Sequence, residues 1–357
     1  MTDRPTRLLA ELAESGAELM LVTSLVNVRY LTGFTGSNAA ALIGPDTRVF
    51  LTDSRYTEQA AAEVDPSFTH RAIRGALDDE VAPLLGEGEL RLGFEDADLT
   101  VRDHARLRAA LPERVTLVAA GSPVETLRAV KEPEEIERIR AATELADAAM
   151  REIMAQGLAG RTEAEVALAL EDAMRRRGAS RPSFETIVAS GAHGALPHAT
   201  PRDVTIGTGE LVVIDWGAVL DGYCSDCTRT LATGELPDAT YVVYDLVREA
   251  QQAGLEGIGP GRSGKAADAR ARELIEAGGH GEHFGHSLGH GVGLEVHERP
   301  RLSPRFDDEL AAGNVVSCEP GIYVPGELGV RIEDLCVVTE SGCEILTRIP
   351  KELITVD

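Results

Sequence analysis

The sequence predicts two domains, an α/β domain followed by a larger domain of the α+β class. The chain has 357 residues, which is more than one domain usually holds and suits two. Its first third alternates apolar strand patterns with helical patterns, as α/β domains do. After Gly121-Ser122-Pro123, two long amphipathic helices come first, and strands with glycine-rich loops follow them. We therefore place the domains at residues 1–122 and 123–357.

Short elements separated by turn residues make up the predicted first domain. Glycine and proline end or join them, as at Gly16 after the first helix and at Gly44-Pro45-Asp46 between two strands. The predicted elements are a helix over 7–15, strands over 19–23, 39–43, 49–52 and 91–94, a helix over about 101–111 and a strand over 116–119.

Two helices open the predicted second domain. Lys131-Glu132-Pro133 begins the first, because a proline in the first helical turn loses no hydrogen bond. Thr162 and Glu165 have the spacing of a capping box at the start of the second helix, which ends at Gly178. Since the clustered polar residues come after these helices, we expect the functional site in this later part.

Composition and charge exclude several classes of function. The formal net charge of -24 repels phosphate groups, so nucleic acid and anionic membranes are poor partners. Residues 1–16 carry charges where a signal peptide would be apolar, and no apolar run approaches the length of a membrane span. Five cysteines, an odd number, favour free thiols in a reducing compartment. We therefore expect a cytoplasmic protein that binds neither nucleic acid nor membrane.

A pair of carboxylates lies on a predicted β-hairpin. The apolar run 211–214 ends in Asp215, and Asp221-Gly222 is a strong signal for a two-residue turn. This turn pairs Asp215 with Thr228, which makes Asp226 the diagonal neighbour of Asp215 on the same face. Two acids in apolar surroundings repel each other unless a cation or a proton intervenes. A metal ion is our interpretation, and two solvated acids on an edge hairpin are the alternative for this pair taken alone.

Five of the nine histidines lie between residues 280 and 297. They alternate with glycines, which permit close backbone approach and unusual dihedral angles. A single histidine more often has a structural role, whereas a cluster among glycines favours a functional loop. The cluster contains His280, His283, His286, His290 and His297.

Two glutamates lie in or after apolar strands near the end of the chain. Glu319 follows 315–318, and Glu333 lies within 329–335, where strand alternation puts Arg331 on the same face. A buried carboxylate needs a partner, and a metal ion with an arginine would serve. Four carboxylates and one histidine form an oxygen-rich set that suits manganese, cobalt, iron or zinc. More than one bridging carboxylate implies two ions, about 3.5–4 Å apart.

Three other patterns are interpreted as structural. Residues 259–265 match the first seven positions of a phosphate-binding loop, but Ala266 replaces the hydroxyl residue that would hold magnesium. Cys224 and Cys227 lack a second pair at zinc-ribbon spacing, so we interpret them as packing residues. Three further histidines have no neighbouring residues that indicate a catalytic or metal-binding role, so we assign them none. They are His70, His104 and His193.

The five candidate ligands stand in a specific order along the chain, most of them within a short sequence motif. They are Asp215, Asp226 in Ser-Asp-Cys-Thr-Arg-Thr, His290 in Gly-His-Gly-Val-Gly, Glu319 in Glu-Pro-Gly-Ile-Tyr and Glu333 in Val-Arg-Ile-Glu-Asp. This pattern resembles the pita-bread metallopeptidases, in particular their Xaa-Pro aminopeptidase and prolidase branch. Residues 27–34 and 51–56 also resemble the creatinase-like N-terminal domain of that branch. The resemblance covers essentially the whole chain and implies an α/β creatinase-like domain followed by an α+β pita-bread catalytic domain.

The resemblance assigns the metal ligands position by position. Asp226 and Glu333 would bridge two divalent ions, and Asp215 would bind one of them through both oxygens. His290 and Glu319 would bind the other ion, and Glu319 would also accept the proton of the bridging water.

The resemblance also assigns the groups that act on the substrate. His198 and His297 would hold the substrate and stabilise the oxyanion. His286 would line the proline pocket, and Tyr323 with Arg331 would form a proton-relay pair.

These roles imply a metallo-exopeptidase that hydrolyses the bond between an N-terminal residue and a following proline. Manganese is the first choice of metal, with cobalt, zinc or iron as alternatives. Residues 52–56 look more like short Xaa-Pro aminopeptidases, with prolidase close behind. The relatives commonly form homodimers in which one subunit's N-terminal domain leans over the other's active site.

Three alternatives to this function remain. Methionine aminopeptidase shares the ligands but normally lacks the first domain. Creatinase works without metal, and a non-catalytic pita-bread binding module would have lost ligands that this chain retains.

Overall fold

The computed structural model describes residues 3–356, which form two compact units that divide between Arg128 and Ala129. The sequence prediction divides the chain after Ser122, and helix α6 (Pro123–Ala129) spans the difference. α6 is tied to the first unit, because Arg128 Nη1 donates to Asn27 Oδ1 at 2.7 Å. Along residues 3–356, no helix is long and apolar enough to cross a membrane.

The first unit is built on a six-stranded mixed sheet with the order β4-β3-β2-β1-β5-β6. Its core is formed by apolar strand residues together with Leu107 and Leu111 at the end of α5. The strands are β1 (Leu19–Val22), β2 (Ala39–Gly44), β3 (Thr47–Asp53), β4 (Thr69–Ile73), β5 (Leu90–Phe94) and β6 (Val115–Ala119). The helices before α6 are α1 (Arg4–Leu12), α2 (Leu25–Thr32), α3 (Thr57–Glu63), α4 (Leu77–Val81) and α5 (Val101–Ala110).

Every element predicted from the sequence in this unit is present within a few residues, so the α/β prediction is confirmed here. The sequence prediction missed α2, α3, α4 and β4. β4 lacks an apolar face, because four of its five residues are exposed, and periodicity therefore could not reveal it.

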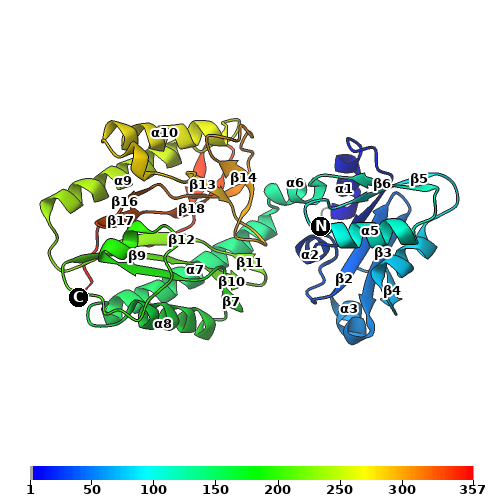
Figure 1. Ribbon diagram of the computed structural model, residues 1–357, viewed down its shortest axis with the longest axis horizontal. Coiled ribbons are helices and arrows are strands. Elements are labelled where there is room, and N and C mark those ends of the chain that lie inside the picture. Colours follow the sequence, from blue (N-terminus) through cyan, green and yellow to red (C-terminus); the bar gives the residue numbers. More distant parts are fainter. Residues whose placement is uncertain (1–2, 357) are drawn as a thin grey trace. The chain divides into compact units, whose positions relative to one another are not determined.

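The second unit contains strands with helices on two sides, α9 and α10 on one and α7 and α8 on the other (Figure 1). Its helices are α7 (Pro133–Gln156), α8 (Glu163–Arg176), α9 (Asp238–Gly257) and α10 (Gly264–Ala277), with short 3-10 turns η3 (Gly191–Ala195) and η4 (Gly281–His283). The first strands are β7 (Arg181–Pro182), β8 (Ile187–Ser190), β9 (Glu210–Trp216), β10 (Ala218–Leu220), β11 (Tyr223–Cys224) and β12 (Cys227–Thr233). The later strands are β13 (Gly289–Gly291), β14 (Glu298–Leu302), β15 (Val315–Cys318), β16 (Gly321–Val324), β17 (Leu328–Arg331), β18 (Asp334–Val338) and β19 (Cys343–Ile345).

Two sheets carry most of these strands, with the orders β12-β9-β8 and β14-β13-β15-β18-β19. Both predicted helix starts are confirmed, with Pro133 in the first turn of α7 and a Thr162–Glu165 capping box on α8. The segment 259–265 joins α9 to α10, and Ser263 caps α10 by accepting from Ala266 N. It is an interhelix turn, as interpreted from the sequence.

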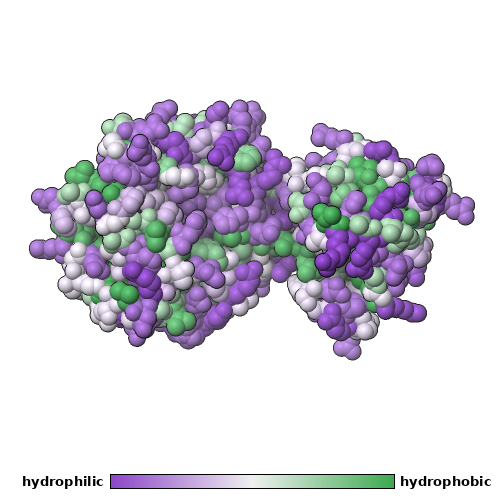
Figure 2. All heavy atoms as spheres, viewed as in Figure 1, coloured by the Kyte–Doolittle hydropathy of each residue, from purple (hydrophilic) through white to green (hydrophobic). Residues whose placement is uncertain are grey.

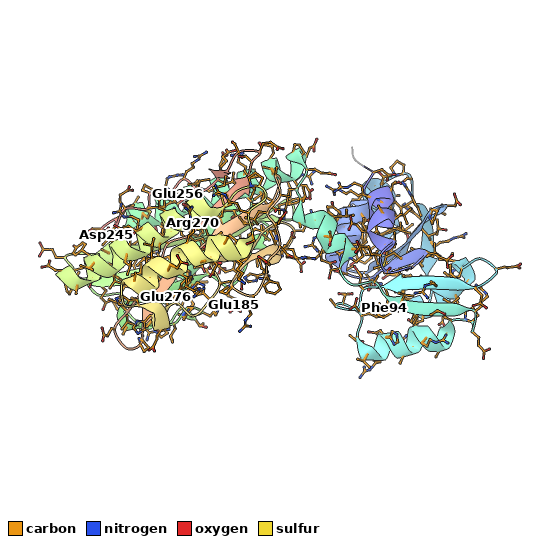
Figure 3. The ribbon with its side chains drawn as sticks, turned by 90° about the horizontal axis from the view of Figure 1, so that it is seen from above. Phe94, Glu185, Asp245, Glu256, Arg270 and Glu276 are labelled. Carbon is orange, nitrogen blue, oxygen red and sulfur yellow. The ribbon has the colours of Figure 1, made fainter. Side chains whose placement is uncertain are left out.

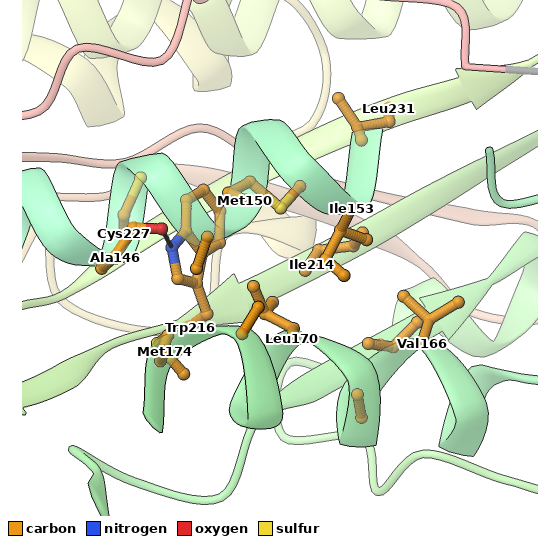
Figure 4. Packing of buried hydrophobic residues seen from close by; sticks show 14 of the residues in the cluster. Ala146, Met150, Ile153, Val166, Leu170, Met174, Ile214, Trp216, Cys227 and Leu231 are labelled. Atoms are coloured by element: carbon orange, nitrogen blue, oxygen red, sulfur yellow. Dashed lines mark hydrogen bonds between the residues drawn. The ribbon is translucent and has the colours of Figure 1, made fainter. Parts of the chain in front are cut away.

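Two apolar cores lie on opposite sides of these strands. One packs α7 and α8 against β9 and β12 (Figure 4), and the buried indole of Trp216 donates to the carbonyl of Ala146 at 3.1 Å. This bond provides an acceptor for the indole N–H, which is buried together with the ring. The other core packs Val247 of α9 and Ala271 of α10 against strand residues such as Val316. The strands between the two cores are therefore held on both faces.

Charged residues cover the outward sides of α9 and α10. Asp245 and Glu256 on α9 and Arg270 and Glu276 on α10 are exposed, and Figure 3 shows both helices from above. Hydrophilic residues also dominate the face seen in Figure 2, with apolar residues scattered among them. The two helices are thus amphipathic, as their buried and exposed faces require.

The predicted hairpin is present but interrupted. Asp221 and Gly222 have φ of 48° and 84°, as a two-residue hairpin turn requires. Asp215 pairs with Thr228, which confirms the predicted register. At Gly217 the partner strand approaches so closely that a Cβ would lie 2.1 Å from the carbonyl oxygen of Ser225. The hairpin therefore breaks between β11 and β12, in the segment that holds Asp226.

Candidate active site

Three carboxylates from separate parts of the second unit meet at one point. Asp215 lies in β9, Asp226 in the break of the hairpin, and Glu333 between β17 and β18. One oxygen of each lies within 4.8 Å of the other two. The hairpin register brings the first two together, and a hydrogen bond of 3.0 Å from Glu333 N to the carbonyl of Thr228 adds the third. These are three of the five ligands predicted from the sequence.

The other two predicted ligands lie beside this cluster. His290 is in β13, and Glu319 directly follows β15, the next strand of the same sheet. His290 Nε2 lies 3.2 Å from Glu319 Oε1 and 3.6 Å from Asp226 Oδ2. The other ring nitrogen, Nδ1, is 3.1 Å from the carbonyl of Gly291, to which it can donate. That hydrogen bond turns Nε2 toward the carboxylates, as metal-binding histidines commonly do.

The electrostatics of the cluster favour a bound cation. Asp226 and Glu333 are 5% and 1% exposed, and burial together with the neighbouring carboxylates raises both pKa values well above the ordinary range. Asp215 Oδ1 and Glu333 Oε1 are buried and accept no hydrogen bond from the described residues 3–356. Buried anionic oxygens without a partner are costly, and a divalent ion would supply one. The donor set, rich in carboxylates with one imidazole, therefore fits divalent metal ions.

Arg331 holds the cluster from its side. Its guanidinium donates to Asp215 Oδ2 at 2.7 Å and to the hydroxyl of Thr228 at 2.9 Å. The Thr228 hydroxyl in turn donates to Glu333 Oε2 at 2.8 Å. Arg331 Nη1 also donates to the hydroxyl of Tyr323 at 2.8 Å. Arg331 and Glu333 thus both bond to the Thr228 hydroxyl, so their side chains lie on the same face, as strand alternation predicts.

A cavity of about 400 Å³ opens beside the carboxylates. The three histidines expected to act on the substrate, His198, His286 and His297, all line it. Its apolar and polar wall residues include Phe184, Ile187, Pro197, Ala199, Pro201 and Arg301. The cavity is of the size that small ligands occupy and has few charged groups away from the carboxylates.

Two of these histidines have lowered pKa values, and one of them has defined hydrogen-bond partners. His286 Nδ1 is 2.8 Å from the carbonyl of Ser287, so that nitrogen donates and Nε2 accepts from the hydroxyl of Tyr323 at 3.0 Å. Burial lowers the pKa of His286. Desolvation at the cavity wall and the neighbouring His290 lower the pKa of His297 to about 4. Both imidazoles are therefore neutral near pH 7.

Two residues of the site were missed by sequence reasoning. Thr228 was expected only as the partner of Asp215, yet its hydroxyl links Arg331 to Glu333. Arg301 lines the cavity near His297. Its position four residues after His297 in a short strand was a weak signal, because strand alternation does not say which face looks into a cavity.

Known proteins match both units of this chain. The sequence model of metallopeptidase family M24 matches residues 137–340, and that of the creatinase/prolidase N-terminal domain matches residues 4–130. An uncharacterized peptidase of Bacillus subtilis is 46% identical over 340 residues, which cover 95% of this chain and 96% of the relative.

Solved structures agree over the whole length. An Xaa-Pro dipeptidase from Bacillus anthracis is 42% identical, covers 99% of both chains and superimposes with a TM-score of 0.95. An X-Pro aminopeptidase from Thermotoga maritima is 39% identical, covers 97% of this chain and all of its own, and has a TM-score of 0.87. The predicted two-domain architecture is thereby confirmed. With a family match over more than half of its length and relatives that cover nearly all of it, this chain belongs to metallopeptidase family M24 and carries a creatinase/prolidase N-terminal domain.

Proposed function

We propose that this protein is an exopeptidase that hydrolyses the bond between an N-terminal residue and a following proline. The observation that carries the proposal is the buried carboxylate cluster, with two unpartnered oxygens, at the wall of a cavity lined by three histidines. Similarity to an Xaa-Pro dipeptidase and an X-Pro aminopeptidase supports the substrate class. A proline nitrogen carries no N–H after acylation, so its peptide bond needs a pocket shaped for the ring.

Two divalent ions are proposed as the cofactor, with manganese as the first choice and cobalt, zinc or iron as alternatives. The residues that would hold these ions are Asp215, Asp226, His290, Glu319 and Glu333, with Asp226 and Glu333 proposed to contact both. When bound, such ions supply a water nucleophile at neutral pH and polarise a carbonyl oxygen.

Glu319 would then accept a proton, and two histidines would stabilise the developing negative charge. Glu319 lies at the cavity wall, 17% exposed at its side chain, where it can accept a proton from the nucleophile. His198 and His297 are exposed to the cavity, and a neutral imidazole N–H from either can donate to the developing oxyanion. Neither needs to be charged for this role, in keeping with the low pKa of His297.

His286, Tyr323 and Arg331 form a connected chain of hydrogen bonds beside the ligands. Arg331 donates to the Tyr323 hydroxyl, which donates to His286 Nε2. This arrangement fixes the direction of each hydrogen bond, since His286 Nδ1 is already a donor to Ser287. We propose that these hydrogen bonds hold His286 against the proline side of the substrate, and that Tyr323 with Arg331 forms the proton-relay pair.

Arg301 supports a preference for dipeptides. It places a positive charge on the cavity wall, where the free carboxylate of a dipeptide could pair with it. A longer peptide has an amide at that point and gains nothing from the charge. Residues 52–56 favour the aminopeptidase alternative instead, so comparing hydrolysis of Gly-Pro with hydrolysis of Gly-Pro-Ala decides between them.

A cytoplasmic location and a homodimer complete the proposal. The location is supported by five cysteines that are all free thiols. The dimer rests on the family resemblance described above.

The decisive experiment compares metal-loaded with chelator-treated protein on Gly-Pro and on Gly-Ala. We expect metal-dependent release of proline and little action on Gly-Ala. Binding of proline peptides without cleavage, in protein that holds its metal, would instead favour a non-catalytic binding module. Preference for an N-terminal methionine would favour the methionine aminopeptidase alternative.

A further inference from the structure

A buried carboxylate outside the metal cluster ties together both ends of the segment that carries His198. Glu163 is the first residue of α8, and its side chain is fully buried at 0% exposure. Its Oε1 accepts from Ser190 N at 2.9 Å, and its Oε2 accepts from Arg202 N at 3.0 Å. These two amides lie on either side of the segment 191–201, which begins with η3, so one carboxylate is bonded to the residues at both of its ends.

Side chains from the same segment complete the set of donors. The Arg202 guanidinium forms two bonds with the Glu163 carboxylate, at 2.9 and 3.0 Å. The hydroxyl of Ser190 adds a bond at 3.0 Å, and His193 Nδ1 lies 3.1 Å from Oε2. Paired bonds from a guanidinium fix direction as well as distance. His193, which had no context in the sequence, thus has a partner.

The start of α8 adds two backbone bonds to the same place. Glu163 N donates to Val204 O at 3.2 Å, and Ala164 N donates to Arg202 O at 3.1 Å. These amides are among those that a helix leaves unpaired at its first turn. Burial by itself raises the pKa of Glu163, but the bonds from Arg202 and Ser190 outweigh it and bring this pKa down to about 2. The group is therefore an anion at neutral pH, where the helix N-terminus also favours it.

The far side of the segment contacts Gly329 and Arg331 of β17, beside the carboxylate cluster. Gly194 packs so closely on Gly329 that a Cβ on Gly329 would lie 1.7 Å from the Gly194 carbonyl oxygen. Arg331 Nη1 donates to the carbonyl of Pro197 at 3.2 Å. His198 follows directly, and its side chain is exposed at the cavity wall. The segment is thus anchored at Glu163 on one side and at Arg331 on the other.

We propose that Glu163, with Arg202 and His193, is a positioning residue that holds His198 at the cavity. Buried ion pairs contribute little net stability compared with apolar residues of similar size, but they define geometry. A catalytic group displaced by about 1 Å can cost on the order of 100-fold in rate. The expected effect on catalysis rests on the role proposed above for His198. The hydrogen bonds that hold both ends of the segment 191–201, which we call the bracing, do not depend on that role.

Amide hydrogen exchange of the full chain tests the bracing without any substrate. Glu163→Gln keeps the shape of the side chain but removes its charge, and it turns one acceptor into a donor facing Arg202. We expect faster exchange at Ser190, Arg202 and the amides between them, with metal content unchanged. Asp147→Asn is the matched control, since Asp147 is also buried and holds a backbone amide, that of Arg348, away from the cavity. Unchanged exchange across 190–202 in Glu163→Gln would overturn the proposal.

A double-mutant cycle tests the link to His198. Glu163→Gln should lower kcat/KM about 10-fold, and in a His198→Ala background it should cost almost nothing further. Equal losses in both backgrounds would mean that Glu163 acts only on the general fold, and would reject the positioning role. If Glu163→Gln fails to fold, Arg202→Met can replace it in the same cycle, because the Arg202 side chain is 44% exposed. Arg202→Lys should then restore part of the rate that Arg202→Met loses. A wild-type protein without Xaa-Pro hydrolysis would refute the proposed function, and the exchange data would still decide the bracing.

Discussion

Thr228 shows how much one side chain decides at the residue scale. Its hydroxyl accepts from Arg331 and donates to Glu333, and its carbonyl accepts from Glu333 N. A single residue thereby orients a carboxylate in the metal cluster and the arginine beside it. Asp215 Oδ1 and Glu333 Oε1 are buried and have no such partner among the described residues, so each can bind a metal ion.

Asp226→Asn should abolish activity and lower the metal content. The carboxylate lies at the centre of the cluster, within reach of Asp215, Glu333 and His290, and an amide cannot neutralise a divalent ion. Elemental analysis of the purified variant beside the wild type measures the loss. Two retained ions with normal turnover would contradict the proposed bridging role.

Metal-free wild-type protein should become less stable as the pH rises above about 4. Burial and neighbouring carboxylates raise the pKa of Asp226 well above the ordinary 3.8, so the folded state holds a proton that the unfolded chain releases. Stability from this group is complete below pH 3.8 and is lost as the pH rises toward the raised value. Metal-free Asp226→Asn lacks this loss, and its melting temperature at pH 8 should exceed that of the metal-free wild type by a few degrees. Thermal melts of both proteins from pH 5 to 8 measure the difference, and parallel curves would contradict the expectation.

His198→Ala and His297→Ala should keep their metal but lose most of their turnover. Both side chains are exposed to the cavity, and His297 is adjacent to the predicted ligand His290 with ring centres 4.4 Å apart. Removing an oxyanion donor typically costs about 100-fold or more in kcat. Metal content and kcat are measured on the same preparations. Stoichiometric loss of metal in either variant would assign that histidine to the ligands instead.

At the scale of elements, the interrupted hairpin explains why Asp226 can reach a metal ion. The tight approach of Gly217 to Ser225 ends the regular pairing, and Asp226 lies in that break rather than in a strand. The two cysteines that flank the break are both buried. Cys227 Sγ donates to the carbonyl of Glu333 at 3.5 Å, so its contact with the site is through the backbone.

Replacing Cys224 and Cys227 together with serine should leave metal content and activity near normal. Burial raises the pKa of Cys224 to about 11 and that of Cys227 well above its usual range, so both remain neutral thiols at pH 7. Neutral thiols are poor nucleophiles and poor metal ligands. Slow alkylation of the native protein by iodoacetamide is the second measurement. A large loss of activity in the double variant would show a chemical role for the pair.

At the scale of the whole molecule, the second unit contains the entire candidate site. Its predicted ligands lie in or beside strands that pack between the core of α7 and α8 and the core of α9 and α10. Elements held on both faces keep ligands in place better than loops do. The first unit contributes none of the ten site residues predicted from the sequence.

The role of the first unit is therefore expected in assembly. The family resemblance predicts a homodimer, so the full chain at micromolar concentration should sediment at twice the mass of one chain. A truncation that begins near Ser122 should keep some metal binding but lose dimerisation and change the preference for peptide length. A fully active monomer in sedimentation would reject a site shared between subunits.

Local chemistry allowed much of this protein to be predicted from sequence. The Asp221-Gly222 turn set the hairpin register, because only a residue pair that tolerates positive φ makes that turn, and the register then paired Asp215 with Thr228. Proline and capping residues marked the starts of α7 and α8 in the same way. Asp215, Glu319 and Glu333 could be named because each stands in or after an apolar strand, where an isolated charge would be costly. Asp226 followed from the hairpin register, and His290 from the histidine cluster and the family resemblance.

Contacts between distant segments were decided only by the tertiary structure. Thr228 bonds to a residue 105 positions away, Glu163 to one 39 positions away, and neither spacing has a period that a sequence pattern could reveal. The surroundings of Arg301 and His193 likewise depend on tertiary packing and not on the neighbouring residues in the chain. Periodicity and turn chemistry act over a few residues, whereas the partner of a buried polar group depends on which strands and helices pack together.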